Sequence, residues 1–185
     1  MRKAKFLVAL GLLLVMGATA AQAQAEKKVQ LDAFGAFVLP MSDFGDVVKA
    51  SPGFGAAIGY YVTPAIVISG NFNWGMMKGK DEAGGELADL DLMNIFGTIG
   101  YDFMALAPNM SFAVYAGGGM MMFRPKPEGA ESYSRPGIDG GLKFNYWFSP
   151  SVGLLLQSGV AYAFMKEDEG TVFALPQVVG VSFKF

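Results

Sequence analysis

The chain of 185 residues contains no cysteine and no histidine, and only 16% of its residues are charged. Without cysteine it forms no disulfide bond or thiolate site, and without histidine it lacks the commonest general base and a frequent zinc ligand. The charged fraction is well below the roughly 25% typical of a soluble domain. Hydrophobic residues make up 52% of the chain, with 25 glycines and 16 phenylalanines. The composition excludes thiol, zinc and histidine-dependent chemistry and indicates a membrane protein.

The N-terminal residues resemble a secretory signal peptide. Arg2, Lys3 and Lys5 form a basic start, the 11 residues from Phe6 to Met16 are apolar, and Ala21-Gln22-Ala23 offers small residues at a cleavage site. An uncleaved membrane anchor is the alternative, but a spanning helix needs about 20 apolar residues. We therefore expect a signal peptide over residues 1–23 and a barrel domain over 24–185. Cleavage leaves 11 basic and 16 acidic residues, a net charge of −5 that argues against a nucleic-acid partner.

Three long uncharged stretches, over residues 50–77, 103–123 and 144–165, are too interrupted for transmembrane helices. Thr63-Pro64, Pro108-Asn109 and Ser149-Pro150 would break the backbone hydrogen bonding that a helix must keep in lipid. A period of two fits better. Between residues 152 and 164 the even positions read Val, Leu, Leu, Ser, Val, Tyr, Phe, whereas the odd positions are mostly small or polar. This alternation is typical of transmembrane β-strands.

The pattern predicts an all-β fold, an eight-stranded antiparallel up-and-down transmembrane β-barrel with both termini in the periplasm. The expected strands cover residues 29–38, 53–62, 65–77, 90–104, 110–123, 136–148, 151–165 and 172–185. Closure into a ring is expected because an open sheet edge in lipid would leave backbone groups without hydrogen bonds. Pro176 predicts a bulge in the last strand, since proline lacks the N–H that a ladder needs.

Connections of two lengths alternate along the chain. Thr63-Pro64, residues 106–109 and Ser149-Pro150 form short uncharged turns, whereas longer charged loops are expected near residues 39–52, 78–89, 124–135 and 166–171. Eleven of the 16 acidic residues lie in these loops: Asp43, Asp46, Asp81, Glu82, Glu86, Asp89, Glu128, Glu131, Glu167, Asp168 and Glu169. Calcium or magnesium prefers such carboxylates, but their spacing matches no fixed calcium loop. We therefore predict solvated extracellular loops, and no metal or cofactor site.

A barrel of eight strands is just wide enough for its side chains to fill the lumen. The alternation directs these polar residues inwards: Asp32, Asn71, Asn73, Asn94, Asp102, Asp139, Lys143, Asn145 and Gln157. Because a buried charge is far less costly when paired, we predict a polar network of Asp32, Asp102, Asp139 and Lys143 that closes the lumen. A gate or a proton path is the alternative. The methionines at 76–77 and 120–122 face lipid or line the upper lumen.

The last seven residues, from Val179 to Phe185, resemble the terminal signal of bacterial outer-membrane proteins. Gly180 is sixth from the end, Val181 follows it, and Phe183 and Phe185 are third-last and last, although Val178 stands where a polar residue is usual. The whole expected mature chain resembles the small outer-membrane barrels typified by OmpX, the OmpA transmembrane domain and, more loosely, OmpW. This resemblance implies the outer membrane of a Gram-negative bacterium. It also implies contact with lipopolysaccharide, and with periplasmic chaperones and the barrel-assembly machinery during biogenesis.

Enzymatic activity is not expected. Outer-membrane barrel enzymes that resemble the lipid A deacylase, palmitoyltransferase, phospholipase and omptin protease rely on a catalytic histidine. This chain has none, so Ser132, Ser134 and Ser158 have no histidine to act as base. Two functions remain open. In the first, a rigid barrel with a filled lumen presents four extracellular loops for envelope structure or surface interaction, as the resemblance to OmpX implies. In the second, a narrow channel or lateral-exit conduit carries small hydrophobic molecules, as the resemblance to OmpW implies.

Overall fold

The computed structural model describes residues 28–82, 85–103, 109–127, 129–166 and 170–185, with no side-chain detail for 81–86. The expected signal peptide, Glu128 and residues 167–169 lie outside these ranges. Eight long strands make up most of the described chain: β1 (Val29–Met41), β3 (Ser51–Tyr61), β4 (Ile66–Gly79), β7 (Leu90–Asp102), β8 (Met110–Pro125), β9 (Tyr133–Trp147), β10 (Val152–Ala163) and β11 (Val172–Lys184). The shorter elements are α2 (Ser42–Val47), β2 (Val48–Lys49), β5 (Asp81–Glu82) and β6 (Gly85–Glu86).

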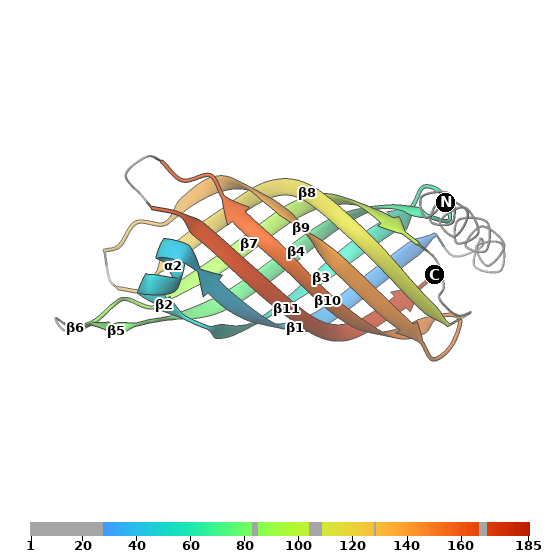
Figure 1. Cartoon of the computed structure of the whole chain (residues 1–185), viewed down its shortest axis with the longest axis horizontal. Helices are drawn as coiled ribbons and strands as arrows, with labels where there is room; N and C mark the ends of the chain where they lie inside the picture. The colour runs from blue at the N-terminus through green and yellow to red at the C-terminus, as the bar shows by residue number, and fades with distance from the viewer. Residues whose placement is uncertain (1–27, 83–84, 104–108, 128, 167–169) are drawn as a thin grey trace, which may run out of the picture.

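The eight long strands form one closed antiparallel ring (Figure 1). Each pairs with its neighbours in sequence, and β1 closes the ring by pairing with both β3 and β11. At the seam, Val29 and Phe185 exchange backbone hydrogen bonds of 3.2 and 2.9 Å. The ring therefore leaves no unpaired edge strand facing lipid. The predicted eight-stranded barrel is confirmed, and every strand begins and ends within three residues of its expected bounds.

Short and long connections lie at opposite ends of the barrel. We call one end the turn end: it carries residues 62–65 and 148–151, the end of β7 and the start of β8. The C-terminus lies there too (Figure 1). The opposite loop end carries α2 and the β5–β6 hairpin. The tight turns share one geometry: the Thr63 hydroxyl accepts hydrogen bonds from the Ala65 and Ile66 N–H groups, at 3.3 and 3.0 Å. Ser149 repeats this at 3.3 and 3.1 Å with Ser151 and Val152. The Thr-Pro and Ser-Pro pairs thus set the turns.

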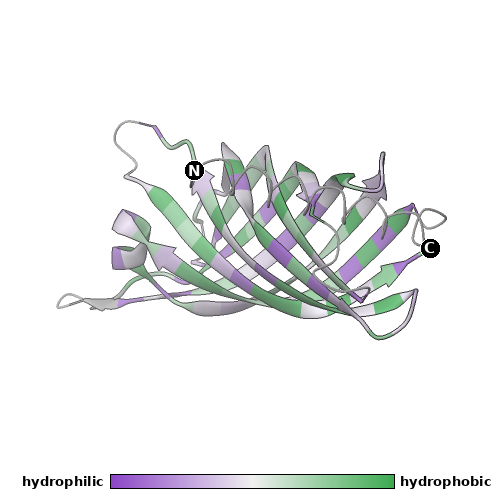
Figure 2. Ribbon diagram, turned by 45° about the vertical axis from the view of Figure 1, so that its right-hand side comes forward, coloured by the Kyte–Doolittle hydropathy of each residue, from purple (hydrophilic) through white to green (hydrophobic). Residues whose placement is uncertain are grey.

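Side chains alternate between the lumen and the outer surface along every long strand. On β10, for example, Leu156 and Val160 are exposed on the outer face, whereas Leu155 and Ala161 are buried inside. Figure 2 shows the resulting bands of hydrophobic and hydrophilic residues along the tilted strands. Aromatic residues gather at the turn end of the outer face, where Tyr101 packs on Phe103 and Tyr146 on Phe148, with ring centroids 5.0 and 5.3 Å apart. The outer surface is that of a protein embedded in lipid.

The predicted bulge at Pro176 is wrong. Ser158 pairs with Gln177 and Ala161 pairs with Ala174, so both strands advance by three residues between these pairs. The ladder between β10 and β11 is interrupted at the proline, but neither strand gains a residue. A missing N–H removes a hydrogen bond without requiring an insertion, and the unbroken pairing of β1 with β11 holds the register.

No helix in the described ranges is long and apolar enough to cross a membrane.

Candidate functional site in the barrel lumen

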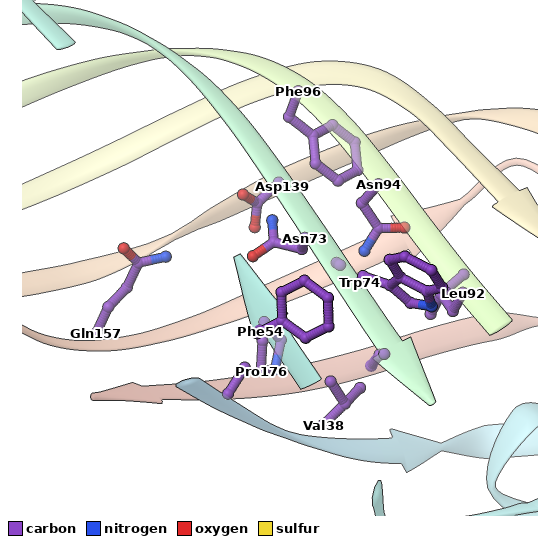
Figure 3. A pocket seen from close by; sticks show the side chains of 14 residues that line it. Val38, Phe54, Asn73, Trp74, Leu92, Asn94, Phe96, Asp139, Gln157 and Pro176 are labelled. Carbon is purple, nitrogen blue, oxygen red and sulfur yellow. The ribbon is translucent and has the colours of Figure 1, made fainter. Parts of the chain in front are cut away.

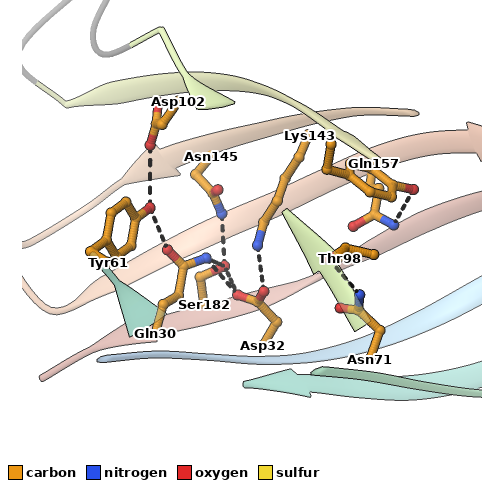
Figure 4. A network of polar contacts seen from close by, with 11 residues as sticks. Gln30, Asp32, Tyr61, Asn71, Thr98, Asp102, Lys143, Asn145, Gln157 and Ser182 are labelled. Atoms are coloured by element: carbon orange, nitrogen blue, oxygen red, sulfur yellow. Dashed lines mark hydrogen bonds and ion pairs between the residues drawn. The ribbon is translucent and has the colours of Figure 1, made fainter. Parts of the chain in front are cut away.

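A polar network fills the lumen near the turn end, with the buried Asp32 carboxylate at its centre (Figure 4). Lys143 Nζ lies 2.5 Å from Asp32 Oδ2. The other oxygen, Oδ1, accepts hydrogen bonds from Ser182 Oγ at 2.6 Å and Gln30 Nε2 at 2.8 Å. Asn145 Nδ2 donates to Ser182 Oγ at 2.7 Å and joins β9 to the network. Asp32 therefore has both a cationic partner and neutral donors, which a buried carboxylate requires.

The network continues to Asp102 through a tyrosine. The Tyr61 hydroxyl lies 3.1 Å from Gln30 Oε1 and 3.2 Å from Asp102 Oδ2. Lys184 is a second lumen cation, and its Nζ lies 4.7 Å from the ring centroid of Tyr61 and 4.4 Å from that of Trp147. Such positions above aromatic faces stabilise an ammonium group. The turn half of the lumen therefore holds two acidic and two basic side chains.

The middle of the lumen holds smaller polar groups. Asn71 Nδ2 donates to Thr98 Oγ1, and Gln157 Nε2 donates to the Tyr115 hydroxyl, both at 2.9 Å. Asp139 also faces the lumen here. It lies four residues from Lys143 along β9, which corresponds to about 13 Å of strand.

The loop half of the lumen is apolar. Its buried cluster comprises Phe44, Val48, Met77, Leu92, Phe96, Met121, Phe123, Ala161, Ala163 and Val172. Phe44 comes from α2, which lies across the loop end, and is only 3% exposed. Its ring packs edge-on against Phe123 with the centroids 6.4 Å apart. Met77 and Met121 are fully buried, whereas Met76 and Met120 face outwards, as a period of two requires.

Two contacts with the β10–β11 loop hold α2 over the loop end. The backbone N–H of Phe44 donates to the Thr171 carbonyl at 3.2 Å, and the Thr171 N–H donates to Asp43 Oδ2 at 2.8 Å. The helix thus fastens the phenyl ring inside the barrel. A polar network at one end and an apolar cluster at the other occupy the lumen.

The structure places every predicted inward residue inside the barrel and brings Asp32, Lys143 and, through Tyr61, Asp102 together. Among the described residues, no hydrogen bond or ion pair joins Asp139 to this network. Sequence reasoning missed Gln30, Tyr61, Tyr115, Ser182 and Lys184 as members of the lumen network. Lys184 lies within the terminal signal, but its position between the outward Phe183 and Phe185 already indicates that it points inwards.

The terminal signal residues occupy both faces of β11. Val181, Phe183 and Phe185 are exposed on the outer face, whereas Gly180 faces the lumen. A Cβ atom at Gly180 would lie 2.3 Å from the Ala33 carbonyl oxygen and 2.5 Å from Phe34 Cβ. Glycine is therefore required by the close approach of β1, independently of any part that the signal plays in insertion.

Comparison with solved structures supports this architecture. Neisserial surface protein A, NspA, is similar over 85% of this chain and 97% of its own, with a TM-score of 0.68 and 18% identity. The fold is that of the small outer-membrane β-barrels. The N-terminal barrel domain of Pseudomonas aeruginosa OprF has a TM-score of 0.59 at 16% identity, over 85% of this chain and 97% of that domain. Ail of Yersinia pestis, in complex with the heparin analogue sucrose octasulfate, has the same TM-score and identity, over 86% of this chain and 99% of Ail. No protein-family model and no curated protein sequence matches the chain.

Proposed function

We propose that this outer-membrane barrel is a non-enzymatic scaffold with a closed lumen, which holds its four loops at the cell surface for envelope structure or surface interaction. The observation that carries the proposal is the filling of the lumen. The Asp32–Lys143 network occupies the turn half, and the apolar cluster with the Phe44 ring occupies the loop half. An open aqueous path would need a continuous polar passage, and the buried apolar cluster interrupts it.

The loops give the surface its charge. They contain eleven acidic and seven basic residues, the latter being Lys49, Lys78, Lys80, Arg124, Lys126, Arg135 and Lys166. This balance favours a basic or neutral partner over a sulfated one such as the heparin analogue bound to Ail. Some basic residues are already paired, since Lys78 Nζ lies 2.7 Å from Asp89 Oδ2 and Lys126 Nζ lies 3.4 Å from Asp91 Oδ1.

Single-channel recording in a planar bilayer tests the closed lumen directly. The refolded chain, without its expected signal peptide, should produce no discrete conductance steps. Reproducible steps in the unmodified protein would overturn the proposal. Phe44→Ala serves as the comparison, because removing the ring opens the apolar half alone and should leave the network of the turn half closed.

Loop shortening tests the surface role. The Leu87 N–H donates to the Lys80 carbonyl at 2.9 Å, which makes Lys80 and Leu87 a hydrogen-bonded pair at the base of the β5–β6 hairpin. Residues 81–86 can therefore be replaced by a two-residue Asn-Gly turn between them. We expect an intact barrel but reduced adhesion of cells that display it, or greater sensitivity of their envelope to bile salts. The matched control exchanges Glu131 for Gln and keeps every loop length. Unchanged adhesion and envelope resistance after shortening each long loop in turn would contradict the proposal.

The apolar loop half favours a second candidate, a conduit for small hydrophobic molecules. Phe44 and Thr171 close this half, and flexible methionine side chains line it. If a solute enters there, Phe44→Ala should accelerate the uptake of N-phenyl-1-naphthylamine by cells that produce the barrel, and Phe44→Trp should slow it. Equal uptake by cells with and without the barrel would exclude this candidate.

A further inference from the structure

Asp139 is an acidic residue of the lumen that has no basic counterpart. It is 7% exposed, and none of the ion pairs of the described residues includes it. Its carboxylate interacts with the Tyr115 hydroxyl and the Gly140 N–H, but its Oδ1 atom is buried and has no hydrogen-bond partner among the described residues. Among the described lumen residues, Asp32 and Asp102 are matched in number by Lys143 and Lys184, so an ionised Asp139 has no counter-charge. An isolated charge at this depth is strongly unfavourable.

A small cavity lies beside this carboxylate. It has a volume of about 20 Å³, and its polar lining comes from Asp139, Asn73, Asn94 and Gln157 (Figure 3). The Asn94 Oδ1 atom is a second buried oxygen without a partner in the described structure. A cavity needs roughly 10 to 15 Å³ to hold one water-sized particle, so this one has room for a single small occupant. Asp139 and Asn94 therefore both border this cavity, and each has a buried oxygen without a hydrogen-bond donor among the described residues.

We propose that this cavity binds one monovalent cation of about the size of sodium, with the Asp139 carboxylate as charged ligand and the Asn94 amide oxygen as neutral ligand. Hard cations prefer such carboxylate and carbonyl oxygens. One positive charge neutralises one aspartate, whereas a divalent ion would leave a net positive charge in the barrel. A water molecule would satisfy hydrogen bonds but neutralise nothing.

Binding of radioactive sodium to the barrel in detergent micelles, measured by equilibrium dialysis at pH 8, tests the proposal. We expect one ion per chain. The same ion should stabilise the barrel in lipid vesicles: sodium chloride should raise the urea midpoint of unfolding relative to N-methyl-D-glucamine chloride at equal ionic strength. A free sodium concentration near 100 times Kd corresponds to a shift of about 1 M urea.

Two substitutions locate the ion. Asp139→Asn should abolish both sodium binding and the difference between the two salts, whereas Asp89→Asn, at the loop end, should preserve both. Asn94→Ala keeps the charge of the site and should weaken binding severalfold, which covers the case in which Asp139→Asn fails to fold. The proposal is overturned if no sodium binds, or if Asp139→Asn binds it equally. A midpoint that follows pH but not the cation would identify a proton as the counter-charge and would also overturn it.

Discussion

The Lys143 ammonium lies 2.5 Å from the Asp32 carboxylate, although 111 positions separate these residues in the sequence. They belong to β9 and β1, and β10 and β11 lie between these strands in the ring. The contact therefore crosses the lumen and joins opposite parts of the wall. A buried pair of this kind constrains the side chains around it, because a buried charge that loses its partner strongly destabilises the fold.

Lys143→Met should lower the free energy of unfolding by about 3 to 5 kcal/mol, since it leaves the Asp32 carboxylate buried without its cation. Urea titration of the barrel in lipid vesicles measures the loss. Asp32→Asn combined with Lys143→Met removes both charges and should recover part of it. If Lys143→Met unfolds at the same urea concentration as the unmodified chain, the network does not stabilise the lumen as described.

Gly180→Ala should destabilise the barrel by about 1 to 3 kcal/mol through overpacking against β1. The added Cβ would meet the Ala33 carbonyl oxygen at 2.3 Å, and backbone cannot move aside cheaply. Gly97→Ala is the matched control, because a Cβ there points outwards and meets nothing closer than the Gly118 carbonyl oxygen at 4.0 Å. Equal refolding yields and midpoints for the two variants would show that the close approach at Gly180 is unimportant.

Gln177→Leu should stabilise the barrel in lipid. Gln177 is exposed on the outer face opposite Ser158, and this is the face that a transmembrane barrel turns to lipid. Replacing it by an apolar side chain should raise the free energy of unfolding by about 1 to 2 kcal/mol. Gln157 precedes Ser158 on β10 and therefore faces the lumen. Gln157→Leu should lower the free energy of unfolding, because it removes the hydrogen bond to the partly buried Tyr115 hydroxyl. Changes of the same sign in vesicle unfolding would place one of these glutamines on the other face.

Lys78 sets the acidity of Asp89 at the loop end. Its ammonium donates a hydrogen bond to Asp89 Oδ2 at 2.7 Å, and this bond, with one from the Gly79 N–H, lowers the pKa of that carboxyl. The pair therefore stabilises the fold above the pKa of the unfolded chain and loses this effect as pH falls through the folded pKa. Lys78→Met should raise the pKa of Asp89, as followed by carboxyl ¹³C chemical shifts in nanodiscs. Lys126→Met should raise the pKa of Asp89 less than Lys78→Met does. A larger rise with Lys126→Met would show that Lys126, and not Lys78, is the main cause of the lowered pKa.

The sequence alone determined the barrel and the direction of each wall residue. A transmembrane wall is one strand thick, so the requirement for an apolar outer face imposes a period of two on the sequence itself. The positions of Asp32, Asn145 and Gln157 in the lumen follow from it. The Thr-Pro and Ser-Pro turns and the charged loops then fix the number of strands and the alternation of short and long connections.

The tertiary structure decided which inward residues meet. A strand pattern gives the face of a residue but not its partner across the lumen, because that depends on strand stagger around the ring and on how side chains share a narrow space. Lys143 consequently reaches Asp32 while Asp139, on the same strand and face, borders a cavity. Phe44 shows the same limit: its position in the sequence marks it as part of a loop, and only the folding of α2 over the barrel places its ring in the lumen.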